Sequence, residues 1–185
     1  MARTESNMLP LGTKAPNFTL PDTISGKELS LQYLATAKNA TVIMFICNHC
    51  PYVIHVNEEL VKIAKDYQNK GVQFIAISSN DVDNYPQDGP ELMKKHAQTV
   101  GYPFPYLYDA SQAVAKAYDA ACTPDFYIFD EALKLVYRGR MDGSRPNSGI
   151  PVTGEDMRKA LDNTLEKKPP LDIQLPSMGC NIKWK

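Results

Sequence analysis

One segment in the first third of the chain constrains the fold more than any other: an apolar run followed at once by Cys47-Asn48-His49-Cys50-Pro51. The run covers residues 41–46 without polar alternation, which is typical of a strand buried on both faces of a parallel sheet. Proline suits the first turn of a helix, and apolar residues then recur at helical spacing over 53–67. Gly71 indicates the end of that helix, and residues 72–78 form a second apolar run. The pattern predicts a right-handed βαβ unit.

The rest of the chain predicts a mixed sheet with helices on both faces. Short apolar pieces on either side of Ser25-Gly26-Lys27 indicate an N-terminal hairpin. We divide the chain into a flexible leader (1–10), one α/β domain (11–168) and a C-terminal tail (169–185). The aromatic run 102–108 is either core or the contact surface of a homodimer. The other expected elements are a helix over 90–101, a strand over 106–108, a helix over 112–118, a hairpin of strands 126–129 and 133–137, and a helix over 154–167.

Composition excludes several classes of function. A chain of 185 residues that is 43% hydrophobic can bury a full core as one domain. The net charge of −1 and the lack of a basic run argue against a nucleic-acid partner. No apolar run approaches the roughly 18 residues of a membrane span, and residues 1–7 lack a secretory signal. We therefore expect a soluble cytoplasmic protein with no membrane partner, in a compartment that keeps thiols reduced.

Cys47 and Cys50 are expected to carry the chemistry. At a strand–helix junction, unpaired N–H groups and the helix dipole lower the pKa of a thiol and favour the reactive thiolate. One thiol can attack a disulfide while the other resolves the mixed disulfide. We rank Cys47 as the nucleophile, at the exposed end of the junction, Cys50 as the resolving thiol, and His49 as the residue that tunes the pair. Half of a metal site and two inert core cysteines are the alternatives; the chain has no second close cysteine pair, so we predict no metal and no cofactor.

The sequence resembles a known family over almost its whole length. Phe45-x-Cys47-x-x-Cys50 at a strand end, with Thr123-Pro124 before a later strand pair, resembles the thioredoxin superfamily. The N-terminal Gly12-x-x-Ala15-Pro16-x-Phe18-x-Leu20 is similar to the opening of the peroxiredoxin and thiol-specific-antioxidant branch. Segments 45–53, 101–109 and 179–184 resemble its peroxiredoxin-like, redoxin-domain subgroup. The resemblance implies a thioredoxin-like α/β fold with a mixed central sheet, flanking helices and an N-terminal hairpin extension. It also implies that Thr123 and Pro124 pack against the active cysteines and position a substrate.

Departures from the family pattern bear on the mechanism. Peroxiredoxins carry Pro-x-x-x-Thr-x-x-Cys, and Cys50 fits its peroxidatic cysteine. Ile43 and Cys47 stand where the proline and threonine would be, and the position of the family's arginine falls near Pro124. The groups that polarise a peroxide are therefore missing. His49 at the third place of the tetrad is similar to Cys-Pro-His-Cys of a strongly oxidising family member, in which a low thiolate pKa stabilises the dithiol form.

Two further cysteines are candidate accessory thiols. Cys122 is either a third thiol near the pair or, as we favour, a small buried hydrophobe. Cys180 lies in the tail, where the resolving cysteines of some peroxiredoxins occur, and could equally be a packed or an exposed residue.

These observations predict a thiol–disulfide oxidoreductase that uses a Cys47/Cys50 dithiol–disulfide couple in cell redox homeostasis. Its substrate would be a protein disulfide, a small thiol or a peroxide, and a cellular dithiol would reduce it. One alternative is an antioxidant thiol peroxidase with Cys50 as the peroxidatic residue and Cys47 or Cys180 resolving. Another is a non-enzymatic copper-binding module, although such modules carry Cys-x-x-x-Cys-Pro, which is one residue longer than the spacing here.

Overall fold

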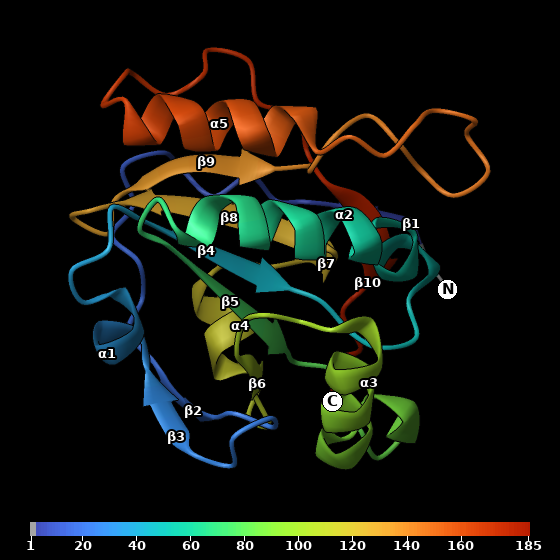
Figure 1. Ribbon diagram of the computed structural model, residues 1–185. Coiled ribbons are helices and arrows are strands. Elements are labelled where there is room, and N and C mark those ends of the chain that lie inside the picture. The colour runs from blue at the N-terminus through green and yellow to red at the C-terminus, as the bar shows by residue number, and fades with distance from the viewer. Residues whose placement is uncertain (1–2) are drawn as a thin grey trace.

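A five-stranded sheet forms the centre of the computed structural model, which describes residues 3–185 (Figure 1). The strand order is β6-β5-β4-β8-β9; β4, β5 and β6 are parallel, and β8 is antiparallel to both of its neighbours. The predicted mixed α/β sheet, with its βαβ unit from β4 to β5, is therefore confirmed. The bounds are Ala40–Phe45 for β4, Val72–Ser78 for β5, Tyr106–Tyr108 for β6, Asp125–Asp130 for β8 and Leu135–Gly139 for β9.

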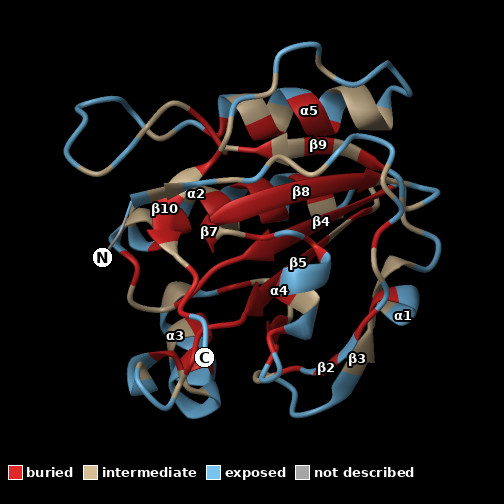
Figure 2. Cartoon of the chain, turned by 180° about the vertical axis from the view of Figure 1, so that it is seen from behind, coloured by how far each residue is buried: buried red, intermediate tan, exposed pale blue. Residues whose placement is uncertain are grey.

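Helices cover both faces of this sheet, as expected. One face packs against α2 (Pro51–Gln68), α3 (Pro90–Val100) and α5 (Glu155–Leu165), and the other against α1 (Leu31–Ala35) and α4 (Ala113–Ala117). In β4, Val42 and Met44 join the first core, whereas Ile43 and Phe45 join the second. Every residue of β4 is buried, which Figure 2 shows as a continuous red strand. Burial on both faces explains why this run of sequence lacks polar alternation.

Two smaller predictions are also settled. The N-terminal hairpin is present as β2 (Thr19–Pro21) and β3 (Glu28–Ser30), and it lies over the same face as α1. The aromatic run is core rather than a contact surface, because Tyr102, Phe104 and Tyr106 are each at most 8% exposed. In the described part of the chain, no helix is long and apolar enough to cross a membrane.

The two ends of the chain meet in a second, three-stranded antiparallel sheet. Its order is β1 (Arg3–Glu5), β10 (Met178–Asn181) and β7 (Cys122–Thr123). Residues 3–5 of the predicted flexible leader are therefore paired rather than loose, and the tail contributes a strand that its sequence did not predict. The domain boundaries at residues 10 and 168 stay a prediction. The second sheet places the tail beside the start of α2 (Figure 1).

Candidate active site

The Cys-x-x-Cys pair lies where β4 ends and α2 begins. Cys50 immediately precedes the helix, and Pro51 is its first residue, as predicted. The amides of Val53 and Ile54 donate to the Cys50 carbonyl at 3.0 Å, which fixes the first turn. Cys47 is 1% exposed and Cys50 0%, and both are free thiols. The sequence-based placement of Cys47 at an exposed end of the junction is thus corrected: both sulfurs are covered.

The loop before Pro124 packs against both thiols, as the resemblance implied. Cys47 Sγ lies 3.5 Å from Thr123 Oγ1, and Cys50 Sγ lies 3.2 Å from the Thr123 carbonyl oxygen. The Thr123–Pro124 peptide bond is cis. The substrate-positioning role of Thr123 and Pro124 stays a prediction, because the backbone of Thr123 is already paired with Cys180 of the tail.

Of the two accessory cysteines, only Cys180 contacts the pair. Its Sγ lies 2.7 Å from Cys50 Sγ, and its side chain is buried. The Cys122 thiol instead faces the Pro124 carbonyl at 3.7 Å, and burial raises its pKa far above the ordinary range. Cys122 therefore behaves as the small buried hydrophobe that the sequence favoured, while Cys180 joins the site.

The electrostatic environment distinguishes the three thiols at the site. Hydrogen bonding from the Cys47 thiol, together with the Cys180 thiol and the Val53 amide, lowers the pKa of Cys50 from 9.0 to about 5. The same hydrogen bond, burial and the nearby Asp88 carboxylate raise the pKa of Cys47. Burial and the contact with Cys50 raise the pKa of Cys180 to about 12. These shifts favour the thiolate on Cys50, whereas the sequence ranked Cys47 as the nucleophile.

We expect this thiolate to titrate at unusually low pH. In the folded protein the pKa of Cys50 is about 5 rather than the ordinary 9.0, so the thiolate is present at neutral pH, and the stability it contributes grows from about pH 5 to its full value above about 9.0. Both are lost as the pH falls through about 5. Acid titration of the reduced protein, followed by the ultraviolet absorbance of the thiolate, should show this step in the wild type and not in Cys50→Ser. A step confined to the ordinary thiol range would contradict the assignment.

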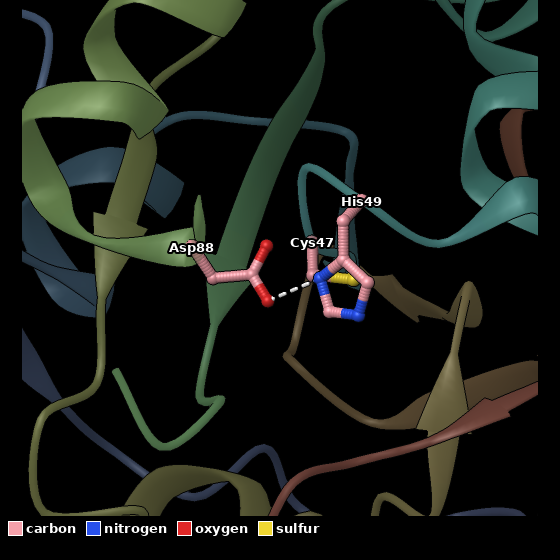
Figure 3. A group of neighbouring side chains, drawn as sticks. All are labelled: Cys47, His49 and Asp88. Carbon is pink, nitrogen blue, oxygen red and sulfur yellow. Dashed lines mark ion pairs between the residues drawn. The ribbon is translucent and has the colours of Figure 1, made fainter. Parts of the chain in front are cut away.

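A buried carboxylate organises the residues between the two cysteines. Asp88, in a short 3-10 helix (Pro86–Asp88), is fully buried and pairs with His49 Nδ1 at 2.6 Å (Figure 3). The Asn48 amide donates to Asp88 at 2.9 Å, and the Asn80 side chain does so at 2.8 Å. The His49 ring stacks on Tyr85, with 5.8 Å between centroids. Hydrogen bonds to a buried charge are worth about 1.5–3 kcal/mol each, so Asp88 holds the active-site turn in shape.

Sequence reasoning missed Asp88. It lies in a turn-rich loop among other polar residues, and no spacing marks it. The available signal was positional: the loop follows β5, and the carboxyl ends of the parallel strands β4 and β5 meet at one edge of the sheet.

Within residues 3–185, one cluster of three side chains could hold a metal ion: Cys47, His49 and Asp88. One ligand atom each of Cys47, His49 and Asp88 lies within 4.8 Å of the others (Figure 3). Sulfur, imidazole and carboxylate are ligands that zinc accepts. However, the Asp88 carboxylate already accepts from the Asn48 amide and the Asn80 side chain and pairs with His49, so it has partners without an ion. The predictions of no metal and no cofactor, and the copper-binding alternative, stay untested.

Comparisons with known proteins place the chain among its relatives. Residues 11–138 match the model of the AhpC/TSA family. No curated protein matches. An uncharacterized conserved protein from Geobacillus kaustophilus is 62% identical, with a TM-score of 0.97 over 100% of this chain and 97% of that chain. A hypothetical protein from Sinorhizobium meliloti 1021 is 46% identical, with a TM-score of 0.96 over 98% of each chain. The thioredoxin domain of a thiol-disulfide oxidoreductase from Bacteroides vulgatus is 20% identical, with a TM-score of 0.60 over 70% of this chain and 88% of that chain.

The likeness to the Bacteroides domain shows the fold, which is thioredoxin-like as the sequence predicted. The family model covers well over half of the chain and includes both Cys47 and Cys50. The resemblance to the thiol-specific-antioxidant branch is confirmed: the chain belongs to the AhpC/TSA family.

Proposed function

We propose that this protein is a thiol–disulfide oxidoreductase that cycles between a Cys47/Cys50 dithiol and a disulfide in cell redox homeostasis, in the cytoplasm. The observation that carries the proposal is the position of Cys50 at the start of α2, with Cys47 in the same turn and both sulfurs against Thr123. Hydrogen bonding there lowers the pKa of Cys50. A thiolate with an adjacent thiol is the minimum needed for disulfide exchange. The AhpC/TSA family match supports the same class of chemistry.

The steps follow from the positions of the two sulfurs. The Cys50 thiolate attacks one sulfur of a substrate disulfide; a mixed disulfide forms, and the other half of the substrate leaves as a thiolate. Cys47 then loses its proton and attacks Cys50 Sγ, which releases the second half of the substrate and forms the Cys47–Cys50 disulfide. A cellular dithiol reduces this disulfide by the reverse exchange. Because both sulfurs are buried, the substrate reaches Cys50 only when the covering segments move.

His49 and Asp88 support this exchange without entering it covalently. The Asp88 carboxylate raises the pKa of Cys47, so the resolving thiol stays protonated and donates to the Cys50 thiolate. The ion pair between His49 and Asp88 fixes the turn that sets the spacing of the two sulfurs.

A thiol peroxidase is the second candidate, and the low pKa of Cys50 favours it as well, because a thiolate is also the form that attacks peroxide. Against it stand the residues around that sulfur. Its hydrogen-bond partners among the described residues are Cys47, Cys180, Thr123 and the Val53 amide, and none of them carries a positive charge that would stabilise the leaving oxygen.

A side-by-side assay separates the two candidates. The wild type would be supplied with one dithiol reductant and either a small disulfide, a protein disulfide or hydrogen peroxide. We expect the second-order rate constant for the preferred disulfide to exceed that for peroxide by at least about tenfold. The described hydrogen-bond partners of Cys50 include no positively charged group to polarise a peroxide, and disulfide exchange does not need one. Faster peroxide turnover, with sulfenate or sulfinate at Cys50, would establish the peroxidase instead.

A further inference from the structure

The C-terminal tail occupies the edge of β7 that faces the active-site thiols. Cys180 of β10 pairs with Thr123, and Asn181 pairs with Cys122. On its other side β10 is covered by β1 (Figure 1). An extended protein chain would have to displace β10 in order to pair with Thr123 along this edge. The chain therefore presents a cysteine of its own where an incoming strand would lie.

Contacts on both sides of Cys180 hold the tail in this place. The Ser177 hydroxyl donates to the Pro124 carbonyl, and the Lys183 amide donates to Asn80 Oδ1 at 2.9 Å. Asn80 also donates to the carboxylate that organises the active-site turn. The tail is thus anchored to the two loops that surround the thiols. Cys180 is therefore held beside the thiols by ordered backbone and does not lie on a mobile segment.

The sulfur contact is close enough for bond exchange. Cys50 Sγ and Cys180 Sγ are 2.7 Å apart, and a disulfide bond is about 2.05 Å long, so a small shift of either side chain closes the gap. Cys50 therefore has a thiol neighbour on each side, Cys47 within its own turn and Cys180 on β10. Cys122, the fourth cysteine, faces the Pro124 carbonyl instead.

We propose that Cys180 is an internal exchange partner of the active site, which moves the disulfide from Cys47–Cys50 to Cys50–Cys180. The inference rests on the proposed dithiol chemistry and adds a second disulfide to it. The Cys180 sulfur attacks Cys50 Sγ, the Cys50–Cys180 bond forms and the Cys47–Cys50 bond breaks. Cys47 leaves as a thiolate and takes up the proton that the Cys180 thiol gives up. The chain holds one disulfide before and after the step, so no oxidant or reductant is consumed.

Peptide mapping can detect this second disulfide. The protein would be oxidised with diamide, its free thiols blocked with N-ethylmaleimide, and the product digested with trypsin and analysed by mass spectrometry without reduction. Cleavage after lysine leaves Cys47 and Cys50 together in peptide 39–62, Cys180 in peptide 168–183 and Cys122 in peptide 117–134. A Cys47–Cys50 disulfide therefore stays within one peptide, whereas Cys50–Cys180 links two.

We expect peptides 39–62 and 168–183 to be joined by a disulfide both in the wild type and in Cys47→Ser. In the wild type, the linked species should carry the maleimide on Cys47. In both, the linked species should exceed the background of Cys180→Ser by at least about tenfold, because the two sulfurs are already in contact. Cys122→Ser is the matched control and should give the wild-type pattern. Circular dichroism would establish that each variant is folded.

The outcomes separate this inference from the proposed function. If the wild type forms the disulfide within peptide 39–62 and its linked species stays at the Cys180→Ser background, the internal exchange is wrong and the dithiol couple stands. If neither disulfide forms in the folded, oxidised wild type, the proposed function itself fails. The wild-type measurement decides the matter even if Cys47→Ser does not fold.

Discussion

We expect the Cys50→Ser variant to lose disulfide turnover by at least about 100-fold, because it removes the sulfur that carries the thiolate. Cys47 cannot replace it. Its hydrogen bond to Cys50 is the largest cause of its raised pKa, but burial and the Asp88 carboxylate remain after that bond is lost. The remaining thiols at and beside the site, Cys180 and Cys122, also have raised pKa values. The variant should therefore contain no thiolate at neutral pH.

Cys47→Ser should behave differently, since it leaves the attacking sulfur in place. An aromatic disulfide that releases a coloured thiolate on each exchange step allows the two steps to be counted. In rapid mixing, we expect a first release from Cys47→Ser at a rate within about tenfold of the wild type, and no comparable phase from Cys50→Ser. The double variant Cys47→Ser/Cys180→Ser should stop after that first release, with a stable mixed disulfide on Cys50.

Cys122→Ser is the matched control, because it removes a buried thiol that lies outside the sulfur contacts, and its rate should stay within about threefold of the wild type. The opposite pattern, with a fast first release from Cys50→Ser and none from Cys47→Ser, would restore the order that the sequence suggested.

The sequence predicted the parts of this site that depend on neighbouring residues. The apolar run of β4, Pro51 and the helical spacing of α2 are local patterns, and together they place Cys47 and Cys50 at the junction. The helix is amphipathic, with Val53, Leu60 and Ile63 buried, so its packing against the sheet could be inferred as well. Thr123-Pro124 was located by resemblance rather than by pattern, and the structure places it against both sulfurs.

What could not be predicted depends on contacts between distant parts of the chain. Cys180 is 130 residues from Cys50, and β10 has no strand pattern of its own because it contains Gly179 and Asn181. It becomes a strand through its pairing with β1 and β7. Asp88 is 40 residues from Asn48, and it accepts a hydrogen bond from the Asn48 backbone amide. The hydrogen bond between Cys47 and Cys50 is the largest cause of the order of the thiol pKa values, and Cys180 and Asp88 reinforce that order. Its direction could not be inferred from the local sequence, which ranked Cys47 first.

Gly179→Ala should detach the tail from the active site. A Cβ at Gly179 would lie 1.9 Å from the Thr123 carbonyl oxygen and 3.2 Å from the Pro124 nitrogen, which are backbone atoms that no side-chain rotation can move. β10 must therefore shift away from β7 and take Cys180 with it. Overpacking of this kind costs about 1–3 kcal/mol, and we expect at least that loss in the free energy of unfolding.

The same substitution tests whether docking of the tail makes the internal disulfide. In oxidised Gly179→Ala, the linked peptides that contain Cys50 and Cys180 should fall by at least about tenfold, since exchange depends on sulfurs held in contact. Gly143→Ala is the matched control: the nearest atoms to its Cβ would be those of the flexible Arg140 side chain, at an ordinary contact distance of 3.7 Å, so stability and disulfide pattern should both stay as in the wild type. Denaturant unfolding and peptide mapping measure the two effects separately. If Gly179→Ala kept the Cys50–Cys180 disulfide at the wild-type level, the thiols would not need β10 to meet, and the tail would be only a cover for the site.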